Sequence, residues 1–226
     1  MKYSNIICGE FISRPNRFCA IVNIDGVQTV CHVKNTGRCK EILVPGCKVY
    51  LEESSNTSRK TKYDVVALEK GKRIINIDSF APNLAIGEWL TGGGLFKNPV
   101  LVKSECSYKS SRFDFFVKAE NKEIFIEVKG VTLENNGVVM FPDAPTQRGV
   151  KHLKELMECV KDGYEAYIIF VVQMTDVKYF TPNEETHKEF ADVLRQCHKN
   201  GVNILCFDCQ VTPQTMKIGK QVEVRL

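Results

Sequence analysis

The chain has 226 residues, of which 43% are hydrophobic and 26% are charged, and its formal net charge is +4. This is the composition of a globular protein with one large domain or two small ones, and its size excludes any need for disulfides to complete the core. The mild excess of basic residues permits a nucleic-acid or phosphate partner without requiring one.

The chain begins with "MKYSNIICGEFISRPNRF", which contains no apolar segment of the kind that a secretory signal peptide needs. No later stretch approaches the roughly 18 consecutive apolar residues of a transmembrane helix. We therefore expect a cytoplasmic protein with no membrane partner. Its 10 cysteines should then be reduced thiols that are mostly buried.

Residues 1–82 are predicted to form a small domain of short strands. The stretch "FCAIVNIDGVQTVCHV" contains two β-rich runs around Asp25-Gly26, a dipeptide typical of hairpin turns. The stretches "GCKVYLEES" and "KTKYDVVALEKGKRIINID" continue the pattern. Several short strands at close spacing indicate a small barrel or a sandwich.

Residues 83–226 are predicted to form an α/β domain, entered through "APNLAIGEWLTGGGLFKNP", which has room for a short helix. Two strands, "SRFDFFVKAE" and "KEIFIEVKGVTLE", are predicted to form an antiparallel pair. Two helices follow, in "TQRGVKHLKELMECVKDG" and "PNEETHKEFADVLRQCHKNG", because apolar residues recur there at helical spacing and a glycine stands past each end. The apolar runs "EAYIIFVVQM" and "VNILCFDCQV" are typical of buried strands.

Asp114, Glu127 and Lys129 are charged residues within the apolar strand pair. Glu127 and Lys129 point to the same face because side chains alternate along a strand, and the hairpin brings Asp114 near them. Two neighbouring carboxylates resist ionisation unless a cation balances them, and Mg²⁺ or Mn²⁺ suits oxygen ligands. We predict a metal-dependent site in which Lys129 acts on the attacking water. The alternative is a surface ion pair, since Glu-x-Lys is common by chance.

The helix after this pair begins with Thr146 as a candidate cap, followed by Gln147 and Arg148 in its first turn. Side chains at these two positions can face the site and contact a scissile phosphate. Lys151 and His152 lie on the same part of the helix. Glu105 is a further candidate metal ligand, with a surface charge as the alternative, and Asp143 is expected to serve as a cap or turn residue.

A basic and polar cluster in the first domain is predicted to bind a nucleic-acid strand, with cationic side chains on phosphates and an aromatic ring on a base. Phe18 is the candidate for stacking, although we favour a core position for it. "NTG" at residues 35–37 is expected to make a turn. The predicted nucleic-acid-binding residues are Arg14, Asn16, Arg17, Phe18, Lys34, Asn35 and Arg38.

The order of these residues resembles two known patterns. The first is an Asp followed by a hairpin, a Glu-x-Lys sequence and a helix. This succession resembles the motif of the PD-(D/E)xK nuclease superfamily. From end to end the chain resembles the sugar fermentation stimulation protein A (SfsA) family, in "RPNRF", "HVKNTGRCKEILVPG", "SRFDFFV", "FIEVKGVTL" and "FPDAPTQRGVKHLKEL". Lys34 departs from the proline that is usual before "NTG".

The resemblance implies an N-terminal OB-fold β-barrel followed by a restriction-endonuclease-like mixed α/β domain. It also implies DNA binding and metal-dependent nuclease activity, with Asp114, Glu127 and Lys129 as the catalytic set and Glu105 as an added acid. The resemblance does not distinguish DNA from RNA or single from double strands as the substrate, and it does not give the oligomeric state.

Three alternatives to the nuclease or its metal site remain. The chain could be a non-catalytic DNA-binding regulator, which the family resemblance would link to sugar (maltose) metabolism, or a hydrolase of small phosphate esters. Cys206 and Cys209 form a CxxC motif near Cys197 and His198, but ordinary buried cysteines are favoured over a zinc site because the upstream pair is adjacent rather than spaced.

Overall fold

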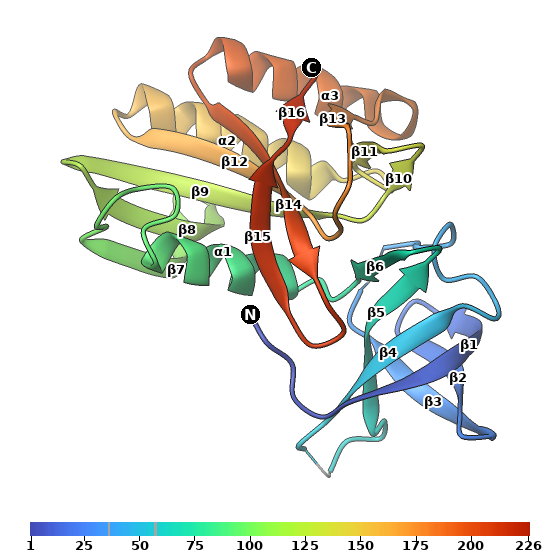
Figure 1. Cartoon of the computed structure of the whole chain (residues 1–226). Coiled ribbons are helices and arrows are strands. Elements are labelled where there is room, and N and C mark those ends of the chain that lie inside the picture. The colour runs from blue at the N-terminus through green and yellow to red at the C-terminus, as the bar shows by residue number, and fades with distance from the viewer. Residues whose placement is uncertain (36, 57) are drawn as a thin grey trace.

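The computed structural model describes residues 1–35, 37–56 and 58–226, which form two packed domains (Figure 1). In the first domain the strands pair in the order β3-β2-β1-β4-β5-β6, and an additional β3–β5 pairing closes β1 to β5 into a barrel. The predicted small barrel is therefore confirmed. Its strands are β1 (Ile6–Asn16), β2 (Cys19–Ile24), β3 (Val27–Val33), β4 (Lys48–Glu53), β5 (Tyr63–Lys70) and β6 (Arg73–Asn76).

The β2–β3 hairpin shows why the local sequence folds in this way. Asp25 and Gly26 join the strands with φ angles of 50° and 85°, the left-handed conformation that two-residue hairpin turns require. In the flanking strands Ala20 and Val22 point inward and are fully buried. The predicted hairpin is confirmed.

The second domain is built on a six-stranded sheet with the order β15-β14-β12-β9-β8-β7. Its three central strands β9, β12 and β14 run parallel, and the flanking pairs are antiparallel. The elements of the sheet are β7 (Leu101–Tyr108), β8 (Ser111–Ala119), β9 (Lys122–Val131), β12 (Glu165–Val172), β14 (Asn203–Val211) and β15 (Met216–Gln221).

Helices cover both faces of this sheet, as the predicted α/β architecture requires (Figure 1). The first helix, α1 (Ala81–Thr91), packs on one face, while α2 (Gln147–Lys161) and α3 (Glu184–Lys199) pack on the other. The side chain of Thr146 caps α2 by accepting a hydrogen bond from the N–H of Gly149, as predicted. No helix in the described part of the chain is long and apolar enough to cross a bilayer.

One feature of the second domain lies outside the sequence prediction. A small sheet pairs short strands in the order β10-β11-β13-β16, partly by parallel pairing between segments far apart in the chain. These strands are β10 (Glu134–Asn135), β11 (Val138–Phe141), β13 (Tyr179–Pro182) and β16 (Glu223–Val224). The proposed domain boundary after residue 82 falls within the first turn of α1.

The CxxC motif lies inside β14, where its two cysteines face opposite sides of the sheet. Cys206 belongs to the core beneath α2 and α3, whereas Cys209 belongs to the core beneath α1. Both thiols are fully buried, and burial raises their pKa. The two sulfurs therefore do not share a site, which removes the zinc alternative at this motif.

Polar contacts fix the two domains against each other. At the end of β6, Asn76 accepts a hydrogen bond from the Gln173 side chain at 2.8 Å, and its own N–H donates to the Gln173 carbonyl at 2.9 Å. Glu134 of the second domain pairs with Lys70 at 3.0 Å and with Arg73 at 3.3 Å. The backbone N–H of Arg38 donates to Asp143 at 3.0 Å.

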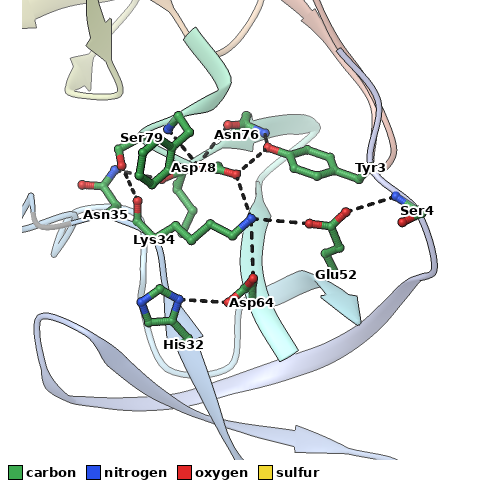
Figure 2. Close-up of polar contacts among 12 residues, drawn as sticks. Tyr3, Ser4, His32, Lys34, Asn35, Glu52, Asp64, Asn76, Asp78 and Ser79 are labelled. Carbon is green, nitrogen blue, oxygen red and sulfur yellow. Dashed lines mark hydrogen bonds and ion pairs between the residues drawn. The ribbon is translucent and has the colours of Figure 1, made fainter. Parts of the chain in front are cut away.

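Lys34 lies at the centre of an acidic cluster beside this junction (Figure 2). Its ammonium nitrogen is 3.4 Å from Glu52, 3.5 Å from Asp64 and 3.3 Å from Asp78. Burial alone would lower the pKa of Lys34, but the three carboxylates outweigh it and raise the pKa. Lys34 thus serves as the internal cation of a buried cluster.

Candidate active site

Alternation along β9 divides its side chains between the two faces of the sheet. Ile124, Ile126 and Val128 pack in the core beneath α1, while Phe125 packs in the core beneath α2. Glu127 and Lys129 therefore emerge on the α2 side, as the sequence predicted. The Lys129 ammonium donates to Oε1 of Glu127 at 2.6 Å.

His152 of α2 makes the second contact to Glu127. Its Nδ1 hydrogen-bonds to the same Oε1 atom, and its Nε2 accepts from Nε of Arg148 at 3.4 Å. The acceptor role of Nε2 places the proton of the neutral ring on Nδ1. Oε1 of Glu127 thus has two donors, whereas Oε2 is buried without a hydrogen-bond partner among the described residues.

Asp114 lies in β8, next to β9. Its Oδ2 accepts a hydrogen bond from the N–H of Val128 at 2.7 Å, and its Oδ1 accepts one from the Asn83 side chain of α1 at 2.7 Å. The first contact ties the carboxylate to the residue directly between Glu127 and Lys129. The structure therefore brings together all three members of the predicted catalytic set.

The two carboxylates differ in their ionisation. Burial, and then the negative charge of Glu127, raise the pKa of Asp114 to about 6. Burial acts in the same direction on Glu127, but the hydrogen bond from His152 and the charge of Lys129 outweigh it and lower the pKa. Near neutral pH the site thus holds two neighbouring anions, one of them destabilised by its surroundings.

A divalent cation fits this arrangement. The buried Oε2 of Glu127 has an open coordination position, and a cation between the carboxylates would remove the repulsion that raises the pKa of Asp114. The cluster contains two carboxylates and one histidine already engaged by Glu127. Within the described ranges no group of three or more His, Cys, Asp or Glu side chains forms a complete metal cage. Water or substrate oxygens would complete the shell, as is usual for Mg²⁺.

Glu105 lies farther from this centre. It lies in β7 between the paired residues Ser104 and Cys106, with a φ angle of 53°. Its side chain is 67% exposed, and it pairs with Arg112 at 3.5 Å. Both Glu105 and Asp114 line one groove beside α1. Glu105 can therefore approach a ligand in that groove, but it makes no hydrogen bond to the other predicted acids among the described residues.

The start of α2 supplies the other predicted catalytic side chains. Gln147 and Arg148 are both exposed, with the Gln147 amide 3.4 Å from Nε2 of His187 and Arg148 directed to His152. Arg148 is thus linked to Glu127 through one histidine. Gln147 has no hydrogen bond to the acids among the described residues.

Part of the predicted nucleic-acid-binding set lines a basic pocket of about 300 Å³ on the first domain. Arg14 has a structural role there, because its guanidinium donates to the carbonyls of Arg17, Asn35, Gly37 and Arg38 at 2.5 to 2.9 Å. Arg17 and Arg38 are exposed. The pocket is lined by Arg14, Asn16, Arg17, Gly37, Arg38, Lys40 and Leu43.

Three other residues of that set have surroundings that the sequence did not indicate. Phe18 is 45% exposed with the guanidinium of Arg17 above its ring at 4.8 Å, so the favoured core position is wrong. Lys34 is directed into the acidic cluster instead of the basic pocket (Figure 2). Asn35 is engaged with the Ile77 carbonyl and the Gly37 N–H.

The "NTG" segment makes an interdomain contact. Thr36 lies outside the described residues, but a side-chain oxygen of Asn35 accepts from the N–H of Gly37 at 2.7 Å, as in a turn. A Cβ atom at Gly37 would lie 2.6 Å from Oδ2 of Asp143, so glycine is required for the close approach of that carboxylate. Asp143 thus contacts the first domain.

Two residues of the site were missed as such by sequence reasoning. His152 was placed on the correct part of α2, but no pattern linked it to Glu127. The hydrogen bond from Asn83 to Asp114 depends on how α1 packs against β8, and no local motif announces it. The i, i+4 spacing of Arg148 and His152 was the available signal for the first of these contacts.

Comparison with known proteins accounts for both domains. Residues 12–77 match the family model described as "SfsA N-terminal OB domain", and residues 81–215 match "Sugar fermentation stimulation protein RE domain". A sugar fermentation stimulation protein homolog of Ruminiclostridium cellulolyticum is 59% identical over the full length of both chains. The homolog of Clostridium beijerinckii is 56% identical, also over the full length of both.

One solved structure resembles the whole molecule. It is described as the structure of Pyrococcus furiosus SfsA in complex with Ca²⁺, and it shares 26% sequence identity with this chain. The match has a TM-score of 0.91 and covers 100% of this chain and 98% of the other. The arrangement of an OB barrel followed by an α/β domain is therefore common to both.

Proposed function

The chain belongs to the sugar fermentation stimulation protein family, and we propose that it is a nucleic-acid-binding protein that hydrolyses phosphodiester bonds with Mg²⁺ or Mn²⁺. The observation that carries the proposal is the grouping of Asp114, Glu127 and Lys129, with the buried Oε2 of Glu127 left without a partner among the described residues. A group of anions with an open ligand atom suits a hard cation. The Ca²⁺ in the Pyrococcus furiosus relative supports this choice of ligand chemistry.

Asp114 and Glu127 would hold the cation, with Glu105 as a further acid that can approach through the groove. When bound, the cation supplies Lewis-acid stabilisation of the phosphate and lowers the pKa of a bound water. Lys129 would orient that water and stabilise the negative charge that develops on the phosphate. Arg148 and Gln147, at the N-terminus of α2, would bind the phosphate, where the helix dipole also favours an anion.

His152 is the positioning residue of this site. It holds Glu127 through Oε1, together with Lys129, and so leaves Oε2 for the cation. The link from Arg148 to His152 connects the phosphate-binding end of α2 with the carboxylate. Such contacts behind a ligand orient it and tune its affinity.

The first domain would hold the strand. OB folds bind single strands through a basic groove and aromatic platforms. Arg17 and Arg38 are exposed in the basic pocket, and Phe18 presents its ring beside them. These side chains supply phosphate contacts and a stacking surface for DNA or RNA.

The test is cleavage of labelled single- and double-stranded DNA and RNA with Mg²⁺, Mn²⁺ or EDTA. Lys129→Ala should abolish metal-dependent cutting. Because it also removes a partner of the buried Glu127, its thermal midpoint is measured alongside to show that the variant is folded at the assay temperature. Lys118→Ala is the matched control, because Lys118 is an exposed lysine of the neighbouring strand that pairs only with Glu123 among the described residues. Cutting that persists in Lys129→Ala would contradict the proposal. Retention on a gel without cutting would instead favour a DNA-binding regulator linked to sugar metabolism.

A further inference from the structure

An open groove of about 690 Å³ lies between α1 and the strands β7 and β8. Asp114 and Glu105 line it, so two acids of the proposed cation site face the same space. The side chains of Phe80, which directly precedes α1, and of Leu84 in α1 line it as well, with exposed fractions of 66% and 53%. Four residues apart, they lie one helical turn from each other on the same side of the helix start.

The charge of the groove restricts what it can receive. Its described lining contains no lysine or arginine. Of its three carboxylates, Glu88 is paired with the N-terminal ammonium of Met1 at 2.6 Å and Glu105 with Arg112 at 3.5 Å. Away from the proposed cation at Asp114, the described lining therefore offers a phosphate no cationic side chain. A flat neutral group with apolar faces suits the exposed ring of Phe80 and the side chain of Leu84 instead. A nucleobase has this chemistry, and its phosphate could lie outside the groove at the cation.

Phe80 stands on a fixed backbone. Its N–H donates to Oδ1 of Asp78 at 2.9 Å, and the preceding residue, Ser79, hydrogen-bonds to the Lys34 carbonyl of the first domain. The backbone of Phe80 is therefore held at the domain junction, and its side chain lines the same groove as Asp114. A platform that is held in place before binding reduces the ordering cost of a stacked ligand.

We propose that this groove receives an unpaired nucleobase stacked on Phe80, which makes single-stranded nucleic acid the substrate of the site. A base within a duplex is stacked between its neighbours and cannot present its face to a side chain without leaving the helix. The inference rests on the proposed function, because it assigns the base that lies next to the phosphate at Asp114. It adds the class of strand, which the catalytic residues alone leave open.

The experiment uses a single-stranded oligothymidine of about 20 nucleotides, longer than the roughly 4–16 nucleotides that one OB fold covers. One 2-aminopurine is placed at successive positions, and its fluorescence is followed as the full-length protein binds in Ca²⁺. The background is Lys129→Ala, so that the strand stays intact. Quenching at one or two adjacent positions is the expected result, because stacking on an aromatic ring quenches this base.

Phe80→Ala should remove that quenching and weaken binding by about 5- to 100-fold, the range for loss of one base–aromatic stack. Phe80→Tyr should retain both the quenching and the binding affinity. Val100→Ala is the matched control, because Val100 is 85% exposed and lies outside the groove lining. The thermal midpoint of Phe80→Ala checks that the fold is retained, as expected for so exposed a ring.

The outcomes separate this inference from the proposed function. Failure to bind the oligothymidine or any other nucleic acid would overturn both. Binding and metal-dependent cutting that are unaffected by Phe80→Ala, or equal cutting of a hairpin-capped duplex, would overturn the inference alone. Self-association that is lost in Phe80→Ala would also overturn it, because a second copy of the chain would then occupy the groove.

Discussion

His152 and Glu127 are joined by a hydrogen bond from Nδ1 of the imidazole to Oε1 of the carboxylate. Lys129 donates to the same oxygen, so both donors lie on one side of the carboxylate. The other oxygen, Oε2, is buried and has no partner among the described residues. One α2 residue therefore sets which atom of a β9 carboxylate remains available for a ligand.

Removal of this imidazole should weaken cation binding. In His152→Ala the carboxylate of Glu127 loses one of its two donors and its fixed orientation, so we expect Mn²⁺ affinity to fall by about 10- to 100-fold. Isothermal titration calorimetry measures this without relying on turnover. His152→Asn can place an N–H near the former Nδ1 and should recover part of the affinity. His198→Ala, an exposed histidine of α3, is the control. Equal affinity in His152→Ala and the unmodified protein would refute the positioning role.

The raised pKa of Asp114 predicts a pH-dependent stability. Burial and the charge of Glu127 raise this pKa to about 6, above its ordinary value of 3.8. The folded protein therefore binds a proton that the unfolded chain releases between these pH values, and the free energy of unfolding falls as pH rises through this window. The contribution amounts to at most about 3 kcal/mol, by 1.36 kcal/mol per pKa unit.

Asp114→Asn removes this proton linkage. Between about pH 4 and 7, urea unfolding without metal should show the variant gaining stability relative to the unmodified protein as pH rises, with little further change at higher pH. Added Mn²⁺ should stabilise the unmodified protein above pH 6, where Asp114 is ionised, and have little effect on the variant. A difference between the two proteins that does not change with pH would contradict this assignment.

Replacement of Lys34 should expose the repulsion within the acidic cluster. Lys34→Met leaves Glu52, Asp64 and Asp78 without their shared cation. Loss of one partner of a fully buried pair costs roughly 3–5 kcal/mol. Lys34 and Glu52 are each 21% exposed and Arg59 still pairs with Asp64, so we expect a cost of about 2–3 kcal/mol. Burial alone would raise the pKa of Asp64, but Arg59, His32 and Lys34 outweigh it and lower the pKa. The loss of stability in Lys34→Met should therefore shrink as pH falls and the carboxylates protonate.

Lys48→Met provides the comparison for this variant. Lys48 is about half exposed and pairs with Glu69, so its loss should cost less than about 1 kcal/mol. Urea unfolding of both variants gives the two values. A Lys34→Met protein as stable as Lys48→Met would show that the cluster does not depend on the lysine.

Two arginines of the basic pocket should respond differently to substitution. Arg38 is exposed, and Arg38→Ala should weaken nucleic-acid binding and reduce the slope of log affinity against log salt by about 0.7 for a lost single-strand phosphate contact. Arg14→Ala should instead lower the thermal midpoint, because four backbone carbonyls lose their donor. Fluorescence anisotropy at several salt concentrations tests the first expectation. An unchanged slope in Arg38→Ala would argue against this pocket as the strand-binding surface.

Local sequence patterns predicted the longer helices and central strands and the shared face of Glu127 and Lys129, because those depend on short-range periodicity. Alternation in "FIEVKG" placed Glu127 and Lys129 on one face, and Asp25-Gly26 located a hairpin. The surroundings of Lys34 and Asp143 depend on how two domains pack, which no short motif encodes. The same holds for Phe18 and Phe80, whose exposure is set by tertiary neighbours rather than by residue type.

The contact between Gly37 and Asp143 has a consequence for the nuclease activity proposed above. Together with the Asn76–Gln173 and Glu134–Lys70 contacts, it joins the domain that carries the basic pocket to the domain that carries Asp114. In the proposed nuclease, a strand held at the basic pocket would be cut a set number of nucleotides away, so the protein would act as a molecular ruler. Fragments released from a long strand with one anchored end would then share a common length.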